Sequence, residues 1–109
     1  MPDGITPWAE QRVGWTLNFF ADFYSSTLNP AELLESLKLK GLTQARLGTL
    51  SKGERKRTLL ALGLLTPQPL LMLDEPFDGL DLRQTREVMT LLRAHAERGR
   101  TLLLSVHQL

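Results

Sequence analysis

Two short apolar runs near the end of the chain, residues 70–73 and 101–106, constrain the fold more than any other feature of the sequence. Four apolar residues alone fit a strand or a helix, but Pro69 before the first run and Asp74 after it favour a buried strand of a parallel sheet. The second run is apolar and partly β-branched, as strands usually are. We therefore expect two strands at these positions.

The segment between the two runs has the pattern of one amphipathic helix. Asp81 is a suitable N-cap with Gln84 three residues later, apolar residues recur over residues 88–92, and Gly99 marks the end. Strand, helix and strand then occupy about 37 residues, which is the size of one βαβ unit. Because such crossovers are almost always right-handed, the sequence predicts a parallel α/β arrangement here.

The first third of the chain predicts a helix with an unusually wide apolar face. Thr6 and Pro7 fit a cap and a first helical position. Two stripes follow at helical spacing: Val13, Leu17, Phe20 and Tyr24 form one, and Trp15, Phe19 and Phe23 form the other. Such a concentration of aromatic residues indicates a small satellite core or a docking surface. Since one helix cannot bury both stripes equally, we expect most of these residues in a core and one or two at a docking surface.

Two more helices are expected before the first strand. One is capped by Asn29 and stops at Gly41. Ser51 lies three residues before Glu54, which is the spacing of a capping box, and opens another helix that extends to about Leu65. The predicted architecture is a mostly helical half followed by a fragment of a parallel α/β sheet.

The composition is that of one ordinary globular domain. The chain has 109 residues, of which 42% are hydrophobic and 23% charged, and its formal net charge is +1. That charge gives no electrostatic footprint for nucleic acid. The absence of cysteine excludes a disulfide scaffold, a thiolate metal site and a cysteine nucleophile. The longest apolar stretch, residues 59–65, is too short to cross a bilayer, and no signal segment opens the chain, so we expect a domain in the cytosol.

Two adjacent carboxylates, Asp74 and Glu75, directly follow the first predicted strand. The carboxyl ends of parallel strands are where open α/β sheets bind ligands. In phosphoryl transfer one such acid can hold Mg²⁺, and its neighbour can orient or deprotonate the attacking water. The alternative is that the two acids only form a polar turn before Pro76. The residues around them decide between these interpretations.

Three motifs in the second half of the chain resemble those of ATP-binding cassette (ABC) ATPases. Residues 69–81, with the sequence PLLMLDEPFDGLD, resemble the Walker B segment and the following D-loop of that family. Residues 50–54, LSKGE, resemble its signature motif, usually Leu-Ser-Gly-Gly-Gln, and Val106 with His107 resembles its switch histidine. The motifs occur in the family's order at compatible spacing, and the resemblance extends over essentially all 109 residues.

The resemblance implies an α/β fold, a fragment of a P-loop NTPase-like cassette. A helical signature subdomain, residues 1–66, would precede a partial RecA-like core, residues 67–109, so that the chain is one incomplete nucleotide-binding domain. The implied ligands are ATP and Mg²⁺. By the same resemblance, Asp74 binds the metal ion, Glu75 is the general base and His107 senses the γ-phosphate.

The signature-like segment is expected to face a nucleotide that a second cassette holds. The residues that the resemblance assigns to the nucleotide and the partner are Ser51, Lys52, Gly53, Glu54 and Asp81. Asp81 has two compatible roles, a helix cap and an inter-subunit contact. Lys52 replaces the usual first glycine and Glu54 the usual glutamine, which changes the charge near the γ-phosphate.

Physical chemistry supports a phosphate at this helix start independently of the family. The N-terminus of a helix offers unpaired backbone N–H groups and the positive end of the helix dipole. Ser51 adds a hydroxyl, and Gly53 lets a backbone approach closely. The alternative is that Ser51 and Glu54 only cap the helix. Elsewhere, we expect His95 to be structural and the basic residues 55–57 to form a solvated helix face.

A nucleotide-binding P-loop needs the pattern G-x-x-x-x-G-K-[ST]. The one glycine pair at that spacing, Gly48 and Gly53, is followed by Glu54 and Arg55, and glutamate would repel phosphate. In the resembled family the P-loop precedes the helical subdomain, so the chain resembles the C-terminal part of a cassette. By itself it is expected not to hydrolyse ATP.

The resemblance implies part of the nucleotide-binding subunit of an ABC transporter, which couples ATP binding and hydrolysis to transport of a substrate across a membrane. The implied partners are a second cassette and a transmembrane permease subunit at the inner face of the cell membrane, and no nucleic acid is expected. Two alternatives stay open. One is a soluble ABC ATPase acting on the ribosome or DNA, which an inserted linker or coiled coil would favour; the other is a non-catalytic interaction module that uses the aromatic helix.

Overall fold

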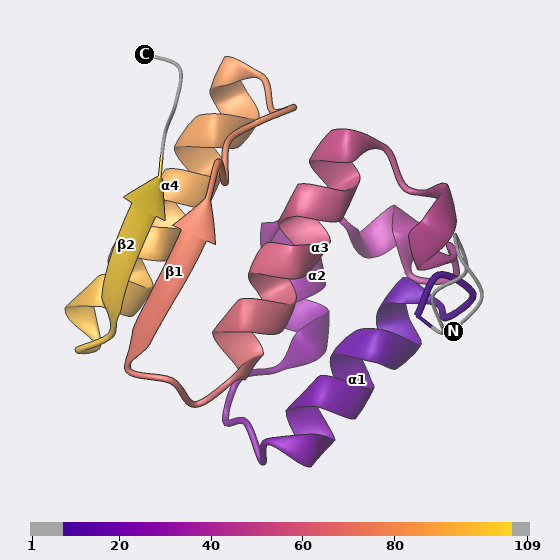
Figure 1. Ribbon diagram of the computed structural model, residues 1–109, viewed down its shortest axis with the longest axis horizontal. Helices are drawn as coiled ribbons and strands as arrows, with labels where there is room; N and C mark the ends of the chain where they lie inside the picture. Colours follow the sequence, from indigo (N-terminus) through magenta and orange to yellow (C-terminus); the bar gives the residue numbers. More distant parts are fainter. Residues whose placement is uncertain (1–7, 106–109) are drawn as a thin grey trace.

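The computed structural model describes residues 8–105 as a group of helices beside a small parallel sheet (Figure 1). The elements are α1 (Val13–Phe23), α2 (Pro30–Ser36), the short 3₁₀ helices η1 (Lys40–Leu42) and η2 (Leu47–Thr49), α3 (Lys52–Leu65), β1 (Leu70–Asp74), α4 (Leu82–Glu97) and β2 (Thr101–Ser105). In Figure 1, α3 lies between β1 and α1, and it contacts both. None of the helices described is long and apolar enough to cross a membrane.

The predicted strand–helix–strand unit is confirmed. β1 and β2 pair in parallel, from Leu70 opposite Thr101 to Asp74 opposite Ser105, with α4 as the connection between them. Asp74 therefore ends β1 and Glu75 follows it, at the edge of the sheet where the sequence predicts a ligand.

Two predicted capping boxes are also confirmed. At α3, Ser51 Oγ accepts from the Glu54 amide at 3.2 Å, and the Ser51 amide donates to Glu54 Oε1 at 2.8 Å. At α4, Asp81 and Gln84 exchange the same pair of bonds at 2.7 and 3.1 Å. Each box supplies side-chain acceptors for two backbone amides that a helix start would otherwise leave to water.

The predicted start of the first helix is wrong. α1 begins at Val13, and residues 8–10 form a turn; the expected cap at Thr6 and Pro7 lies outside the described residues. The amides of Val13 and Gly14 donate to the carbonyls of Ala45 and Thr43, each at 2.9 Å. A distant segment therefore satisfies the first donors of the helix, so no local cap sets its start.

The second helix ends at Ser36, well before the predicted stop at Gly41. Lys38 adopts a left-handed backbone conformation with φ +60°, and Leu37 and Leu39 on either side of it are both fully buried. Residues two apart lie on different faces of a helix. Ending the helix is what lets both leucines enter the core.

The aromatic residues of α1 are more exposed than the sequence predicts. Val13 and Leu17 are fully buried, and Phe20 packs against the core as a half-buried side chain. An aromatic face stays exposed beside them, each ring 39–69% accessible; its members are Trp8, Trp15, Phe19, Phe23 and Tyr24. The expectation that most of these rings pack in a core is wrong, because Val13 and Leu17 occupy that side of the helix.

The expectation of a fully buried strand is also wrong. Leu71 is 7% exposed and packs against Gly63 of α3, but Leu70 and Met72 are 48% and 69% exposed. Alternate side chains of a strand point to opposite faces. Within the described residues one face of the sheet is therefore covered and the other is open.

Among residues 8–105, β2 pairs with β1 on one side and has an apolar, unpaired edge on the other. Such an edge is a template for pairing with another chain. We expect the isolated 109-residue chain to aggregate or to pair this edge with a partner. In a soluble preparation, hydrogen exchange should be much faster at the amides of residues 102–104 than at residues 59–62 inside α3. Strong protection of residues 102–104 in a demonstrated monomer would contradict this expectation.

Candidate functional site

The start of α3 and the loop between β1 and α4 are in direct backbone contact. A Cβ atom placed on Gly53 would lie 2.6 Å from the Gly79 carbonyl oxygen, and one placed on Gly79 would lie 2.9 Å from the Gly53 nitrogen. Gly79 also has φ +82°, in the left-handed region that favours glycine. Gly53 therefore permits a close approach of its backbone to that of Gly79, whereas the close approach to a phosphate that the sequence suggests stays a prediction.

Two lysines of α3 reach the same loop. Lys52 Nζ lies 2.8 Å from Asp78 Oδ2, and Lys56 Nζ donates to the Asp74 carbonyl oxygen at 3.0 Å. The hydrogen bond with Asp78 raises the pKa of Lys52, and the bond with Lys52 lowers the pKa of Asp78. The pair is therefore charged at neutral pH and is lost as the pH falls through the lowered pKa of Asp78 or rises through the raised pKa of Lys52.

Sequence reasoning missed Asp78, because a carboxylate in a polar turn carries no local signal that its partner is a lysine 26 positions earlier. It also misplaced Arg57. The solvated face expected for residues 55–57 is wrong at this position, since Arg57 is 7% exposed. Its guanidinium lies beneath Gly53, and its Nε finds no hydrogen-bond partner among the residues that the structure describes.

The two acids sit where the strand ends. Asp74 is the last residue of β1, and Glu75 has φ +50°, an uncommon conformation for a side-chain-bearing residue. The Glu75 amide donates to the Ser105 carbonyl at 2.7 Å, so the end of β2 holds this turn. Uncommon backbone conformations of this kind concentrate at functional sites.

The carboxylates of Asp74 and Glu75 fit Mg²⁺ only if a bound nucleotide supplies further ligands. Carboxylate oxygen is a suitable ligand for this hard cation, which commonly binds one or two carboxylates together with phosphates of a substrate. Residues 8–105 contain no group of three His, Cys, Asp or Glu residues arranged to hold a metal ion. Asp74 would therefore share the ion with nucleotide oxygens.

The sequence poses helix capping and phosphate contact as alternatives for Ser51, and the structure bears on both. Its Oγ accepts from the Glu54 amide at 3.2 Å. A serine hydroxyl carries one donor and two acceptor positions, so accepting this bond leaves the O–H to donate elsewhere. Capping the helix and contacting a phosphate are therefore compatible.

The remaining candidates are Asp81, His107 and His95. Asp81 caps α4, as predicted, whereas His107 lies outside the described residues. His95 is 6% exposed on the buried side of α4, the placement expected of a structural histidine. Burial is the main cause that lowers the pKa of His95, and the charges of Arg100 and Arg98 add to it.

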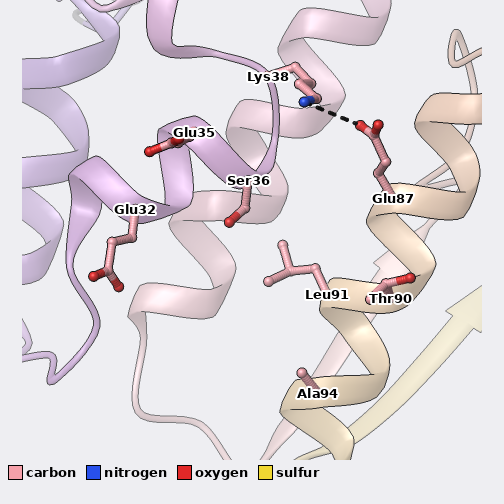
Figure 2. Close-up of a pocket in the computed structure, with 8 residues that line it drawn as sticks. All are labelled: Glu32, Glu35, Ser36, Lys38, Glu87, Thr90, Leu91 and Ala94. Carbon is pink, nitrogen blue, oxygen red and sulfur yellow. Dashed lines mark ion pairs between the residues drawn. The ribbon is translucent and has the colours of Figure 1, made fainter.

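A groove between α2 and α4 lies away from these residues. It has a volume of about 740 Å³ between α2 and α4, and Figure 2 shows Glu32 and Glu35 on one side of it and Glu87 on the other. Lys38 spans it with an exposed ion pair to Glu87 at 3.9 Å. None of the site residues predicted from the sequence lines this groove.

The fold and the site define a class of protein. The capped start of α3 contacts, through Gly53, the loop that follows β1, a parallel strand that ends in an acid. This arrangement is the one expected for part of an ABC-type ATP-binding domain. The sequence model of the family described as "ABC transporter" matches residues 8–78, and the chain belongs to that family. Members of this family in general bind ATP, typically with Mg²⁺, hydrolyse it, and act with a partner cassette and transmembrane domains.

Curated relatives match part of the chain at substantial identity. The chain is similar to the ABC transporter ATP-binding/permease protein Rv1747 of Mycobacterium tuberculosis, with 47% identity over 79 residues. It is also similar to the broad substrate specificity transporter ABCG2 of Bos taurus, with 38% identity over 82 residues. These matches cover 72% and 71% of this chain but only 9% and 12% of the relatives.

A solved structure supports the fold. The ATP-binding subunit of an ABC transporter superposes with a TM-score of 0.79 at 24% identity, covering 97% of this chain and 46% of that subunit. The fold of this chain therefore corresponds to slightly less than half of that structure.

The contact between Gly53 and Gly79 makes a prediction about stability. Gly53→Ala and Gly79→Ala should each destabilise the fold by about 1–3 kcal/mol, because the added carbon meets backbone that cannot move aside. Gly41→Ala is the matched control, since nothing lies within 4 Å of a Cβ there. Urea unfolding checks the three variants, and equal midpoints would contradict the contact.

Proposed function

We propose that this chain is part of the nucleotide-binding subunit of an ABC transporter, placed in the cytoplasm at the inner face of the cell membrane. The observation that carries the proposal is the contact of the Ser51–Glu54 helix start with the loop after Asp74 and Glu75. It brings a phosphate-favouring helix start and a pair of acids suited to phosphoryl transfer onto neighbouring segments.

The proposed roles follow from what each group can do. Asp74 would share Mg²⁺ with the nucleotide, and Glu75 would take the proton of the attacking water as general base. His107, which follows β2 in the sequence, is proposed to sense the γ-phosphate. When bound, Mg²⁺ would neutralise charge on the phosphates.

The signature-like segment is proposed to face the nucleotide of a second cassette. The N-terminus of α3 offers backbone N–H groups and the positive end of its dipole. Ser51 would donate its O–H to a phosphate oxygen, and Lys52 would add a positive charge. Gly53 and Glu54 complete this surface, and Asp81 would contact the partner from the D-loop.

This assignment divides the chain at about residue 66. Residues 1–66 would be the helical signature part, and residues 67–109 a partial RecA-like core. The loop at Gly79 belongs to the second part and rests on α3 of the first. The two groups of proposed residues, one for each nucleotide, thus lie on neighbouring segments where the two parts meet.

The aromatic face is proposed as the contact with a transmembrane permease subunit. Its rings form a continuous series, from Trp8 and Trp15 with centroids 6.4 Å apart, through Phe19, to Phe23 and Tyr24 at 5.0 Å. Exposed apolar patches of this kind mark interaction surfaces. An ABC transporter supplies such a partner.

The proposed catalytic role is tested by ATP turnover. The 109-residue chain alone should not hydrolyse ATP, because its sequence contains no P-loop pattern. With a P-loop segment supplied, within a longer gene product or as a second chain, Glu75→Gln should lower turnover by about 10²–10⁴-fold. Glu32→Gln, on the exposed side of α2, is the control and should have no effect. Turnover that survives in Glu75→Gln would contradict the role of Glu75 as general base, and absence of turnover in the wild-type sequence would favour the interaction-module alternative.

The proposed docking is tested separately. Phe19→Ala and Phe23→Ala should weaken co-purification with the permease subunit while thermal melts stay unchanged, because both rings are exposed. Leu17→Ala, at a fully buried position of the same helix, should instead cost about 2–5 kcal/mol of stability. Unchanged co-purification of the two phenylalanine variants would remove this contact from the proposal.

A further inference from the structure

Three contacts hold the end of β1 and the loop of residues 75–79 to the first turns of α3. The Gly53–Gly79 backbone contact is one, and the hydrogen bond from Lys56 to the Asp74 carbonyl is another. The third is the ion pair between Lys52 and Asp78 at 2.8 Å, which is the only one made between two charged side chains.

Lys52 lies among negative charges of this loop. Its ammonium group pairs with Asp78, and the carboxylate of Glu75 attracts it as well. The positive charges of Lys52 and Lys56 both act on Asp78. Lys52, at the start of α3, therefore interacts electrostatically with Glu75, the residue that follows β1.

The ion pair is connected to Glu75 through the backbone. The Asp78 amide donates to the Glu75 carbonyl at 3.1 Å, and the Glu75 amide donates to the Ser105 carbonyl at 2.7 Å. Fixing the Asp78 side chain thus fixes a turn that begins at Glu75, whose left-handed conformation needs support from its surroundings.

The pair depends on a residue that the signature pattern does not normally supply. That pattern has glycine at position 52, and glycine carries no charge. The ion pair of Lys52 with Asp78 at 2.8 Å is thus a contact that a glycine at position 52 could not make.

We propose that Lys52 and Asp78 form a clasp that positions the 75–79 loop on α3, so that Lys52 is a positioning residue for Glu75. The assignment of Glu75 as general base rests on the proposed function, whereas the clasp itself does not. Both side chains are partly solvated, so the clasp is weak enough to open and sensitive to salt.

Hydrogen exchange tests the clasp without any activity. Lys52→Ala should speed exchange at the Leu80 amide, which bonds within the loop to the Phe77 carbonyl at 3.1 Å. An exposed ion pair predicts an acceleration of about two- to fivefold. Lys52→Arg should keep the original rate, and the exchanged pair Lys52→Asp with Asp78→Lys should restore it.

The matched control is Lys38→Ala, which removes the exposed Lys38–Glu87 pair at 3.9 Å and leaves the loop untouched. It should not change exchange at Leu80. An equal rate at Leu80 in Lys52→Ala and the wild type, or failure of the exchanged pair to restore the rate, would overturn the clasp.

Turnover with the P-loop segment supplied tests the positioning role. Lys52→Ala and Asp78→Ala should each lower kcat, and the double variant should lower it no further, because both remove one contact. Because Lys52 is also proposed to face a nucleotide, the decisive variant is Asp78→Ala, which opens the ion pair and keeps the lysine: its KM should stay unchanged while kcat falls. A loss confined to Lys52→Ala, with Asp78→Ala at the wild-type rate, would overturn positioning and leave Lys52 with nucleotide contact alone. If Glu75→Gln has no effect on turnover, the proposed function fails while the exchange result still decides the clasp.

Discussion

The approach of Gly53 to Gly79 is the contact on which the rest of the site depends. It is made by backbone atoms, and a single added carbon on either side would stand within 3 Å of the other chain segment. Because of it, α3 and the loop after β1 share one surface. The lysine contacts to Asp74 and Asp78 join the same two segments, and the buried Arg57 lies beside Gly53.

A second tether acts at the opposite end of α3. Arg100, in the turn before β2, donates to the carbonyls of Leu64 and Thr66, where the helix ends. Cations are favourable at helix C-termini, since the last carbonyls have no partner within the helix. The helical part is therefore joined to the strand–helix–strand part at both ends of α3, once by glycine backbone and once by an arginine.

The surfaces left open are informative as well. The aromatic face of α1 and the outer face of the sheet, with Met72 and Leu103, expose apolar side chains, and exposed apolar patches mark interaction surfaces. The chain spans about a tenth of the length of its curated relatives. Exposed apolar faces are consistent with the chain's membership of the ABC transporter family, whose members act with partner domains.

The sequence by itself determined what depends on neighbouring residues: the capping boxes at Ser51 and Asp81, the two strands, and the acids that follow the first. Caps and strand patterns act within a few positions, so their signal is local. Only the tertiary structure decided where α1 begins, that Arg57 is buried and that Lys52 pairs with Asp78. These features arise between segments far apart in the chain, and no local pattern records which segments will meet.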